Sequence, residues 1–385
     1  MKCKLIFIAL VSFIVTASAQ QVRIAVFYAD KPNNLVFTIV KGNYIVQSGD
    51  SVIGTLPAKT PVHISYLTGK ILLQYGDTIL QCKPEVYLSG DTGAEFILNT
   101  APAKGADRNY EGSLQVKYQD AYLLAINCIS LEQYVAAVTE TEGGYKKPDE
   151  FYKSQAIITR TYALKNFERH KQEGFELCDG THCQAYKKKC TSPDIVAAVN
   201  ATQGLVLVND SYELIMAAYH SNSGGVTMNS EDVWISALSY LRSVNDKYYV
   251  YGRNAVWQVN ITVEQWKSFL KTKGVDINVS IDSLLITETG RVAKANIRGK
   301  SFPMTEVRHY FKLPSAFLNM SLNGDNIQIS GKGYGHGVGL SQESAMRMAE
   351  EGLTYKEILP FFYSGVHVVN MKTLSVFKSF QEQGE

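Results

Sequence analysis

The sequence predicts an α+β protein in which a β-rich N-terminal region is followed by a mixed α+β domain with a cleft. Three observations lead to this prediction. Short runs of alternating apolar and polar residues, separated by turn residues, fill positions 22–122, as expected of strands joined by tight hairpins. Apolar residues then recur at helical spacing within 131–138 and 156–167. Beyond residue 205 short strand-like and helix-like segments alternate.

Residues 1–19 are predicted to be a signal peptide. Two lysines open the segment, an apolar stretch follows, and Ala17-Ser18-Ala19 forms a small-x-small cleavage site. Removing both lysines and no acid lowers the formal net charge from +2 to zero, which leaves no electrostatic footprint for nucleic acid. No later apolar run reaches the roughly 20 residues that cross a bilayer. We therefore expect export to the periplasm or the cell exterior, with no membrane span after signal removal.

Four segments are expected: the signal peptide, a β-rich region at 20–110, a main domain at 111–370 and a tail at 371–385. The main domain is expected to carry an α/β insertion at about 247–320. The N-terminal region shows no cluster of titratable residues, so a structural or docking role is expected for it.

Helix-capping, helix-breaking and turn residues indicate where the expected helices and strands of the main domain begin and end. Ser130 is a suitable N-cap for a helix that starts at the next residue, and a double glycine should end it near Glu142. A turn at 209–210 should pair strand 205–208 with strand 213–219. The other expected helices span 151–169, 195–201, 263–271, 307–311 and 343–351, and the other expected strands span 283–287, 293–297 and 327–330.

Glu140 and Glu142 lie at the predicted end of the first helix, where a carboxylate can be directed into a cleft. A general acid for glycosidic cleavage must be protonated near neutral pH, which requires burial or a neighbouring negative charge. Hydrolases usually use two carboxylates on opposite sides of the bond, which two positions in one turn seldom provide. The pair therefore favours a single-acid transglycosylase, in which one glutamate protonates the leaving oxygen and then deprotonates a sugar hydroxyl. Two solvated surface glutamates are the alternative.

His170, Cys178, His182 and Cys183 form a compact group of metal-binding side chains. Imidazole and thiolate are ligands that Zn²⁺ prefers, and four of them complete a structural tetrahedral site. The spacing is not that of a zinc finger, and a Cys178–Cys183 disulfide is the alternative in an oxidising compartment. We expect a structural zinc ion.

Two glycine-rich segments complete the candidate set. The segment HSNSGG at 220–225 leaves a predicted strand with small residues, which lets sugar rings approach the backbone closely. The segment GKGYGHGVGLSQ at 331–342 lacks the Lys-Ser/Thr ending of a phosphate loop, so nucleotide binding is not expected. Within it, His336 either lines the cleft or is satisfied in the core.

Taken in order, these motifs resemble the SpoIID/LytB family, which comprises lytic transglycosylases related to stage II sporulation protein D together with amidase enhancers. The resemblance covers about residues 112–366 and includes LEQYVAAV, SQAIITRTYAL, CDGTHCQAY, YHSNSGG, EDVW and GYGHGVGLSQ. The family glutamate is usually followed by Met-Pro, whereas Gly143-Gly144 follows here.

The resemblance implies roles for individual residues. Glu142 matches the catalytic glutamate that precedes the RTYAL run, and the four Cys/His residues match zinc ligands. The residues implied or expected to bind substrate are Arg160, Tyr186, His220, Ser221, Ser223, Gly224 and His336. Enzymes of this type cleave the MurNAc–GlcNAc linkage of peptidoglycan and leave a 1,6-anhydro sugar, and the sporulation members act on strands without stem peptides.

The sequence thus predicts an exported lytic transglycosylase with Glu142 as acid and then base, and with peptidoglycan glycan strands as partner. The alternative is a non-catalytic glycan-binding or amidase-enhancing module, whose partner would include a cell-wall amidase. A third possibility, a zinc hydrolase that cuts the stem peptide, requires an open metal position and only three protein ligands.

Overall fold

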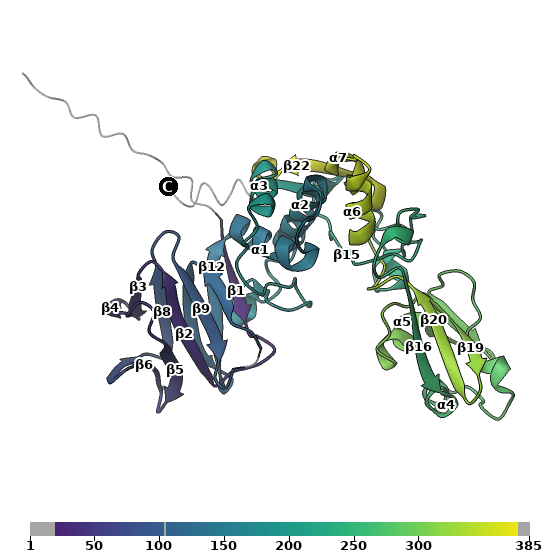
Figure 1. The fold of residues 1–385 in the computed structure, drawn as a ribbon, viewed down its shortest axis with the longest axis horizontal. Helices are drawn as coiled ribbons and strands as arrows, with labels where there is room; N and C mark the ends of the chain where they lie inside the picture. Colours follow the sequence, from purple (N-terminus) through teal and green to yellow (C-terminus); the bar gives the residue numbers. More distant parts are fainter. Residues whose placement is uncertain (1–19, 104, 376–385) are drawn as a thin grey trace, which may run out of the picture.

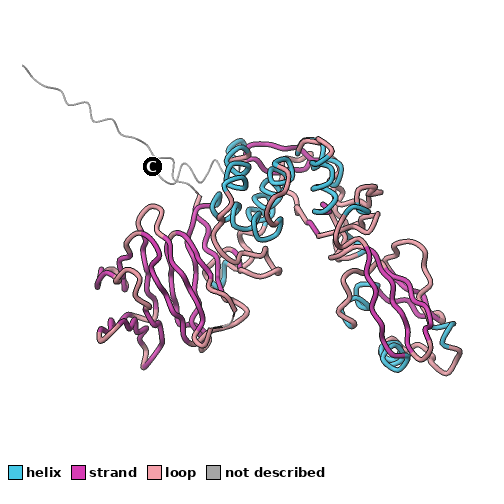
Figure 2. The backbone as a smooth tube through the Cα atoms, viewed as in Figure 1, coloured by secondary structure: helices cyan, strands magenta, loops and turns pink. Residues whose placement is uncertain are grey.

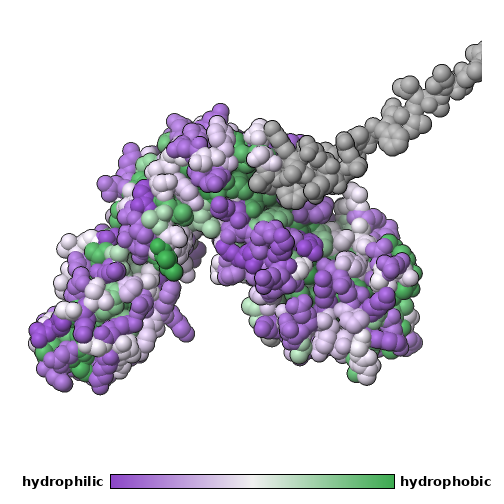
Figure 3. All heavy atoms as spheres, turned by 180° about the vertical axis from the view of Figure 1, so that it is seen from behind, coloured by the Kyte–Doolittle hydropathy of each residue, from purple (hydrophilic) through white to green (hydrophobic). Residues whose placement is uncertain are grey.

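The computed structural model describes residues 20–103 and 105–375, so the predicted signal peptide at 1–19 and residues 376–385 of the predicted tail at 371–385 lie outside the described residues. Figures 1 and 2 show two strand-rich lobes that extend from a helical centre, and Figure 3 shows an open hollow between the lobes. Strands hold 36% of the chain and helices 25%, which confirms the α+β class with a β-rich N-terminal region. Within the described ranges, no helix is both long and apolar enough to span a bilayer.

The first lobe is built from two sheets. One has seven strands in the order β13-β1-β12-β11-β8-β3-β4, and the other has six in the order β10-β9-β2-β5-β6-β7. Among the described strands of these two sheets, every pairing is antiparallel except that of β1 with β13. Because β11 and β12 belong to the first sheet, the boundary predicted near residue 110 falls inside it. The strands are β1 (Gln21–Val26), β2 (Asn34–Lys41), β3 (Tyr44–Ser48), β4 (Ser51–Thr55), β5 (Val62–Leu67), β6 (Lys70–Tyr75), β7 (Thr78–Cys82), β8 (Glu85–Gly90), β9 (Glu95–Thr100), β10 (Arg108–Glu111), β11 (Ser113–Gln119), β12 (Tyr122–Ser130) and β13 (Leu177–Cys178).

Alternating burial along these strands places apolar side chains between the two sheets. In β9 the inward positions include Phe96 and Leu98, and both are fully buried. The Phe96 ring stacks on Phe37 of β2 with centroids 4.9 Å apart, and both rings contact Tyr44 of β3 edge-on. The apolar residues of the period-2 pattern that predicted the strands therefore form the core of this lobe.

The helical centre surrounds α2, which is buried along most of its length. This helix ends at Lys165 rather than at the predicted residue 169. The Asn166 side chain donates a 2.8 Å hydrogen bond to the Tyr162 carbonyl, so it competes with continued helix at this point. The elements of the centre are α1 (Leu131–Gly143), α2 (Asp149–Lys165), α3 (Pro193–Ala201), β14 (Leu205–Asn209), β15 (Tyr219–His220), β21 (Leu340–Ser341), α6 (Gln342–Glu350), α7 (Tyr355–Phe362) and β22 (Val366–Asn370).

The hairpin predicted between 205–208 and 213–219 forms only next to its turn, where the Asn209 N–H donates to the Glu213 carbonyl at 3.0 Å and the Ile215 N–H donates to the Leu207 carbonyl at 3.3 Å. The strand β14 pairs along its whole length with β22, and the residues after the turn make a single bridge from Leu214 to Val208. The chain then leaves this ladder, and β15 pairs in parallel with β21. Both true partners lie far along the sequence, where a local apolar pattern carries no information about pairing.

The second lobe is an insertion with its own hydrophobic core, formed around Trp266, Phe269 and Ile329 and separate from the main core of the described residues. Its sheet includes β19 and β20, so it extends to Lys332, beyond the predicted end near residue 320. Its elements are β16 (Val256–Thr262), α4 (Val263–Thr272), β17 (Lys294–Ile297), β18 (Lys300–Pro303), α5 (Met304–Tyr310), β19 (Leu318–Asn323) and β20 (Asn326–Lys332).

One predicted strand of this insertion, at 283–287, is wrong. The chain forms a short 3-10 turn at Ile281–Leu284 instead. The Leu284 carbonyl accepts a 2.9 Å hydrogen bond from the indole N–H of buried Trp266. An apolar segment that packs under a tryptophan in this way is buried without joining a sheet.

Candidate functional site

Glu142 lies in the last turn of α1, and both ends of this helix are fixed. At the start, Ser130 and Gln133 form a reciprocal capping box. At the end, Gly144 has a φ of +72° and donates its N–H to the Glu140 carbonyl at 3.0 Å. Since a positive φ favours glycine, the second glycine of the pair ends the helix after Gly143, one residue beyond Glu142.

The double glycine also brings α1 close to α2. A Cβ atom on Gly143 would lie 2.9 Å from the Phe151 ring. The Tyr152 hydroxyl donates a 3.0 Å hydrogen bond to the Gly144 carbonyl and accepts a backbone N–H at 3.0 Å. The turn after Glu142 is therefore held by direct contacts, although the Met-Pro pair is absent.

The Glu142 carboxyl group is held in a partly buried position. The Ala185 backbone N–H donates to its Oε1 at 3.0 Å, the Tyr219 hydroxyl lies beside it, and the Gln342 amide reaches the Glu142 backbone carbonyl at 3.5 Å. Burial raises the pKa of Glu142 above its usual range, and these two hydrogen bonds only partly oppose that change. A carboxyl group of this kind keeps its proton to a higher pH, as a general acid requires.

The neighbouring carboxylate, Glu140, has a different environment. It is 3% exposed, and Lys188 lies 3.3 Å from its Oε1. Hydrogen bonds hold the pKa of Glu140 at about 2 in spite of its burial. The group therefore stays ionised, and its hydrogen bonds give it a structural role. Its other donors are the backbone N–H groups of Thr191 (2.7 Å) and Ser192 (2.9 Å) and the Tyr145 hydroxyl (2.7 Å).

We expect Glu140→Gln to lower the free energy of unfolding by about 3 kcal/mol at neutral pH, the value of a pKa difference between about 4.5 and about 2. Because the folded-state pKa is lowered, this stabilisation is present above pH 4.5 and is lost as the pH falls towards 2. Denaturant unfolding at pH 7 and pH 3 measures it. A stability difference between wild type and variant that does not shrink on acidification would contradict this assignment.

The four Cys/His residues come together as a compact group. One ligand atom from each of His170, Cys178, His182 and Cys183 lies within 4.8 Å of all the others. The separations from sulfur to nitrogen are 3.7 Å for Cys178–His182, 3.5 Å for Cys183–His170 and 3.8 Å for Cys183–His182. Tetrahedral zinc with usual bond lengths requires sulfur–nitrogen separations of about 3.5 Å, so the donor set fits this ion.

The surroundings of the group match those of a metal site. Glu173 lies 2.6 Å from His170 Nδ1 and accepts the Tyr28 hydroxyl, also at 2.6 Å. A carboxylate on the second ring nitrogen is the arrangement that orients metal-binding histidines. The Arg169 guanidinium donates to the His182 carbonyl at 2.5 Å. The ligand-bearing loop is therefore positioned by contacts outside the four ligands.

The Cys/His group is connected to Glu142 through the chain. Ala185, whose N–H contacts Glu142, follows Cys183 by two residues. Cys178 is in turn fixed by the parallel pairing of β13 with β1, in which it lies opposite Ala25. All five cysteines after residue 19 are free in the structure, including both candidates for a Cys178–Cys183 disulfide.

Arg160 was expected to bind substrate, and this expectation is wrong. The side chain is fully buried. Its guanidinium donates to both carboxylate oxygens of Glu132, at 3.0 and 2.5 Å, and to the Leu205 carbonyl at 2.9 Å. Arg160 thus joins α1, α2 and β14, and it has no free face for a glycan.

Arg160→Ala should lower the free energy of unfolding by about 3–5 kcal/mol, because it leaves the Glu132 carboxylate partly buried without its cation. Chemical denaturation of the purified variant measures this loss. In the fraction of Arg160→Ala that remains folded, the Michaelis constant should match that of the wild-type protein. A raised Michaelis constant with unchanged stability would instead support substrate binding.

Three more expected substrate residues contact only the protein. Tyr186 is fully buried, and its hydroxyl donates to Asn127 at 2.6 Å. Ser223 is fully buried, and its hydroxyl donates to Asp246 at 2.6 Å. A Cβ atom on Gly224 would lie 2.8 Å from Lys332, so the close approach that this glycine allows is made by the protein chain rather than by a sugar.

The two histidines of the glycine-rich segments do meet, with ring centroids 5.5 Å apart. His220 is buried, and its Nδ1 lies 3.1 Å from the Val338 carbonyl. Burial lowers the pKa of His220 far below its usual value and that of His336 to about 4, so both rings are neutral at pH 7. Ser221 is partly buried, and its carbonyl accepts the N–H of Glu343 at 3.0 Å.

Sequence reasoning missed three groups around Glu142. Tyr219 directly precedes the HSNSGG segment and could have been found from that position. The Ala185 N–H and the Gln342 amide lie 43 and 200 residues from Glu142 along the chain. Local sequence offers no signal for either of them.

The sequence of this chain is similar to those of several known proteins. The family model described as "Stage II sporulation protein" matches residues 119–209, which include α1, α2 and the Cys/His group. The chain is 30% identical to stage II sporulation protein D of Bacillus subtilis (strain 168) over 289 residues, covering 70% of this chain and 84% of that protein. It is also 30% identical to stage II sporulation protein D of Bacillus amyloliquefaciens, covering 63% and 75%. It is 28% identical to the amidase enhancer of B. subtilis (strain 168), covering 56% and 37%.

These matches and the geometry around α1 define the class as that of the stage II sporulation protein D and amidase-enhancer proteins. The chain belongs to the SpoIID/LytB family. The resemblance inferred from the ordered motifs is thereby confirmed.

Proposed function

We propose that the protein is a peptidoglycan lytic transglycosylase that cleaves MurNAc–GlcNAc bonds in peptide-free glycan strands. One observation carries the proposal. Of the two carboxylates at the end of α1, Glu142 alone has a raised pKa, because Glu140 is held by at least four donors. A single acid of this type suits transglycosylation, in which the second nucleophile comes from the sugar itself.

In the proposed reaction, the Glu142 carboxyl group donates its proton to the glycosidic oxygen as the bond from this oxygen to the MurNAc anomeric carbon breaks. The Ala185 N–H and the Tyr219 hydroxyl hold the carboxyl group in place during this transfer. The resulting carboxylate then takes the proton of the MurNAc C6 hydroxyl while that oxygen bonds to the anomeric carbon. Glu142 ends protonated, as it began, and the product carries a 1,6-anhydro ring.

We further propose that a structural zinc ion is held by His170, Cys178, His182 and Cys183. With four protein ligands it would have no open position for substrate, which argues against a zinc hydrolase that cuts stem peptides. Bound zinc would supply a rigid cross-link within the loop. The chain would then present the Ala185 N–H to Glu142 in a fixed position.

The test is incubation of the purified protein with peptide-free glycan strands, read by mass spectrometry. Fragments with 1,6-anhydro ends are expected. The relative named as an amidase enhancer favours a second candidate, a glycan-binding module that stimulates a cell-wall amidase. That candidate predicts bound glycan, no fragments and faster amidase turnover when the two proteins are mixed. Action on cell-wall glycan also requires export, which we propose on the basis of residues 1–19.

A further inference from the structure

An exposed tryptophan lies beside the histidines of the candidate site. Trp234 is 39% exposed, and its neighbour Ile235 is 102% exposed. The other two tryptophans of the chain are less available, because Trp266 is fully buried and Trp257 lies over Gly331 of the insertion sheet. The Trp234 ring is therefore available to contact a ligand beside the candidate site.

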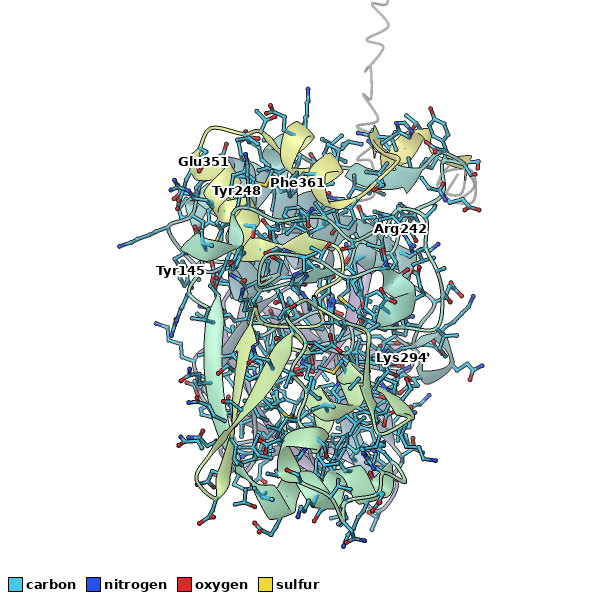
Figure 4. The ribbon with its side chains drawn as sticks, turned by 90° about the vertical axis from the view of Figure 1, so that its right-hand side faces the viewer. Tyr145, Arg242, Tyr248, Lys294, Glu351 and Phe361 are labelled. Carbon is cyan, nitrogen blue, oxygen red and sulfur yellow. The ribbon has the colours of Figure 1, made fainter. Side chains whose placement is uncertain are left out.

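The loop that carries Trp234 is firmly held. The Trp234 N–H donates to the buried Ser230 carbonyl at 2.7 Å, and the Leu238 N–H donates to the Ser230 hydroxyl at 2.8 Å. Arg242, labelled in Figure 4, donates to the Leu238 carbonyl at 2.8 Å and forms a bidentate pair with Glu231. The exposed ring is therefore presented by a fixed backbone.

Contacts connect Trp234 to Glu142 through two residues. The Trp234 and His336 rings lie 5.2 Å apart with an interplanar angle of 50°. His336 accepts the Val338 N–H at 3.0 Å and also bonds to the Tyr219 backbone, and the Tyr219 hydroxyl lies beside Glu142. The four residues are therefore consecutive neighbours, and the link from His336 to Tyr219 is made through the Tyr219 backbone.

We infer that Trp234, backed by His336, is a stacking platform for a pyranose ring of the glycan strand, next to the bond that Glu142 acts on. The apolar C–H face of a sugar packs on an aromatic ring held in a fixed orientation, as aromatic side chains do with other flat apolar partners. His336 is neutral at pH 7, so it adds no charge behind the Trp234 ring. The inference rests on the proposed substrate and is independent of whether the bond is cut.

The test measures the affinity of peptide-free glycan oligomers by calorimetry in a Glu142→Gln background, where turnover is expected to be at least about a hundredfold slower. Trp234→Ala should weaken binding about tenfold, whereas Trp234→Phe, which keeps an aromatic face, should stay within about threefold. Ile235→Ala is the matched control from the same loop, and it should bind as the parent does. Thermal unfolding of each variant verifies folding.

In the otherwise wild-type protein, Trp234→Ala should raise the Michaelis constant about tenfold, in step with the loss of affinity. Unaltered glycan affinity of Trp234→Ala would overturn the inference. Equal weakening by Ile235→Ala would also overturn it, because it would indicate a general apolar surface such as a protein contact. Tryptophan-dependent binding without cleavage by any variant would uphold this inference and reject the transglycosylase proposal.

Discussion

Glu142→Gln should reduce the release of anhydro-ended fragments by about 10²–10⁴-fold, because glutamine retains the shape of the side chain but cannot transfer a proton. The variant should fold normally and bind glycan strands as wild type does. Since the folded-state pKa of Glu142 is raised by burial, stabilisation by its neutral form is lost as the pH rises through that value. The amide should therefore be as stable as the acid or more stable at pH 7.

Mass spectrometry of the products at equal protein concentration measures this effect. Glu140→Gln is the matched control, because it changes the same functional group two residues away. We expect that control to lose stability and to keep turnover in the protein that remains folded. Normal fragment release by Glu142→Gln would reject Glu142 as the acid.

Cys183→Ser should abolish binding of one zinc ion per chain and lower the free energy of unfolding by about 4 kcal/mol, in the range seen when a structural metal is lost. The residue lies 3.5–3.8 Å from the ring nitrogens of His170 and His182, so its loss removes a ligand that contacts both. Because Ala185 follows two residues later, turnover should also fall. Metal analysis by mass spectrometry and thermal unfolding with and without added zinc measure both effects.

Cys190→Ser is the control for this prediction, since Cys190 is a free cysteine outside the group. It should keep its zinc, and its hydroxyl should still donate to Glu140, as the thiol does at 3.3 Å. If the wild-type protein contains no zinc and thiol titration finds Cys178 and Cys183 unreactive, the disulfide is favoured and the zinc proposal is rejected.

The sequence alone predicted those features that depend on neighbouring residues. The Ser130 N-cap of α1 and the strands of the first lobe follow from patterns within about ten residues. The Cys/His group is similarly local, because its four members lie within 170–183 and need only one turn and one short strand to meet. Ordered motifs then identified the family without any structure.

Tertiary structure alone decided which of the expected site residues are buried and which are accessible to a ligand. Arg160, Tyr186 and Ser223 are fully buried in protein contacts, although their types and motif positions suit sugar binding. The pairing of β14 with β22 was likewise beyond local pattern.

The opposite pKa shifts of Glu140 and Glu142 show why the sequence alone could not assign these roles. The two have the same side chain and are two residues apart, yet the pKa of one is lowered and that of the other is raised. The donors and the burial that cause this come from residues 185, 191, 192 and 219, which folding brings to the end of α1. A sequence specifies which groups are present, whereas their solvation and hydrogen bonds exist only once distant segments pack together.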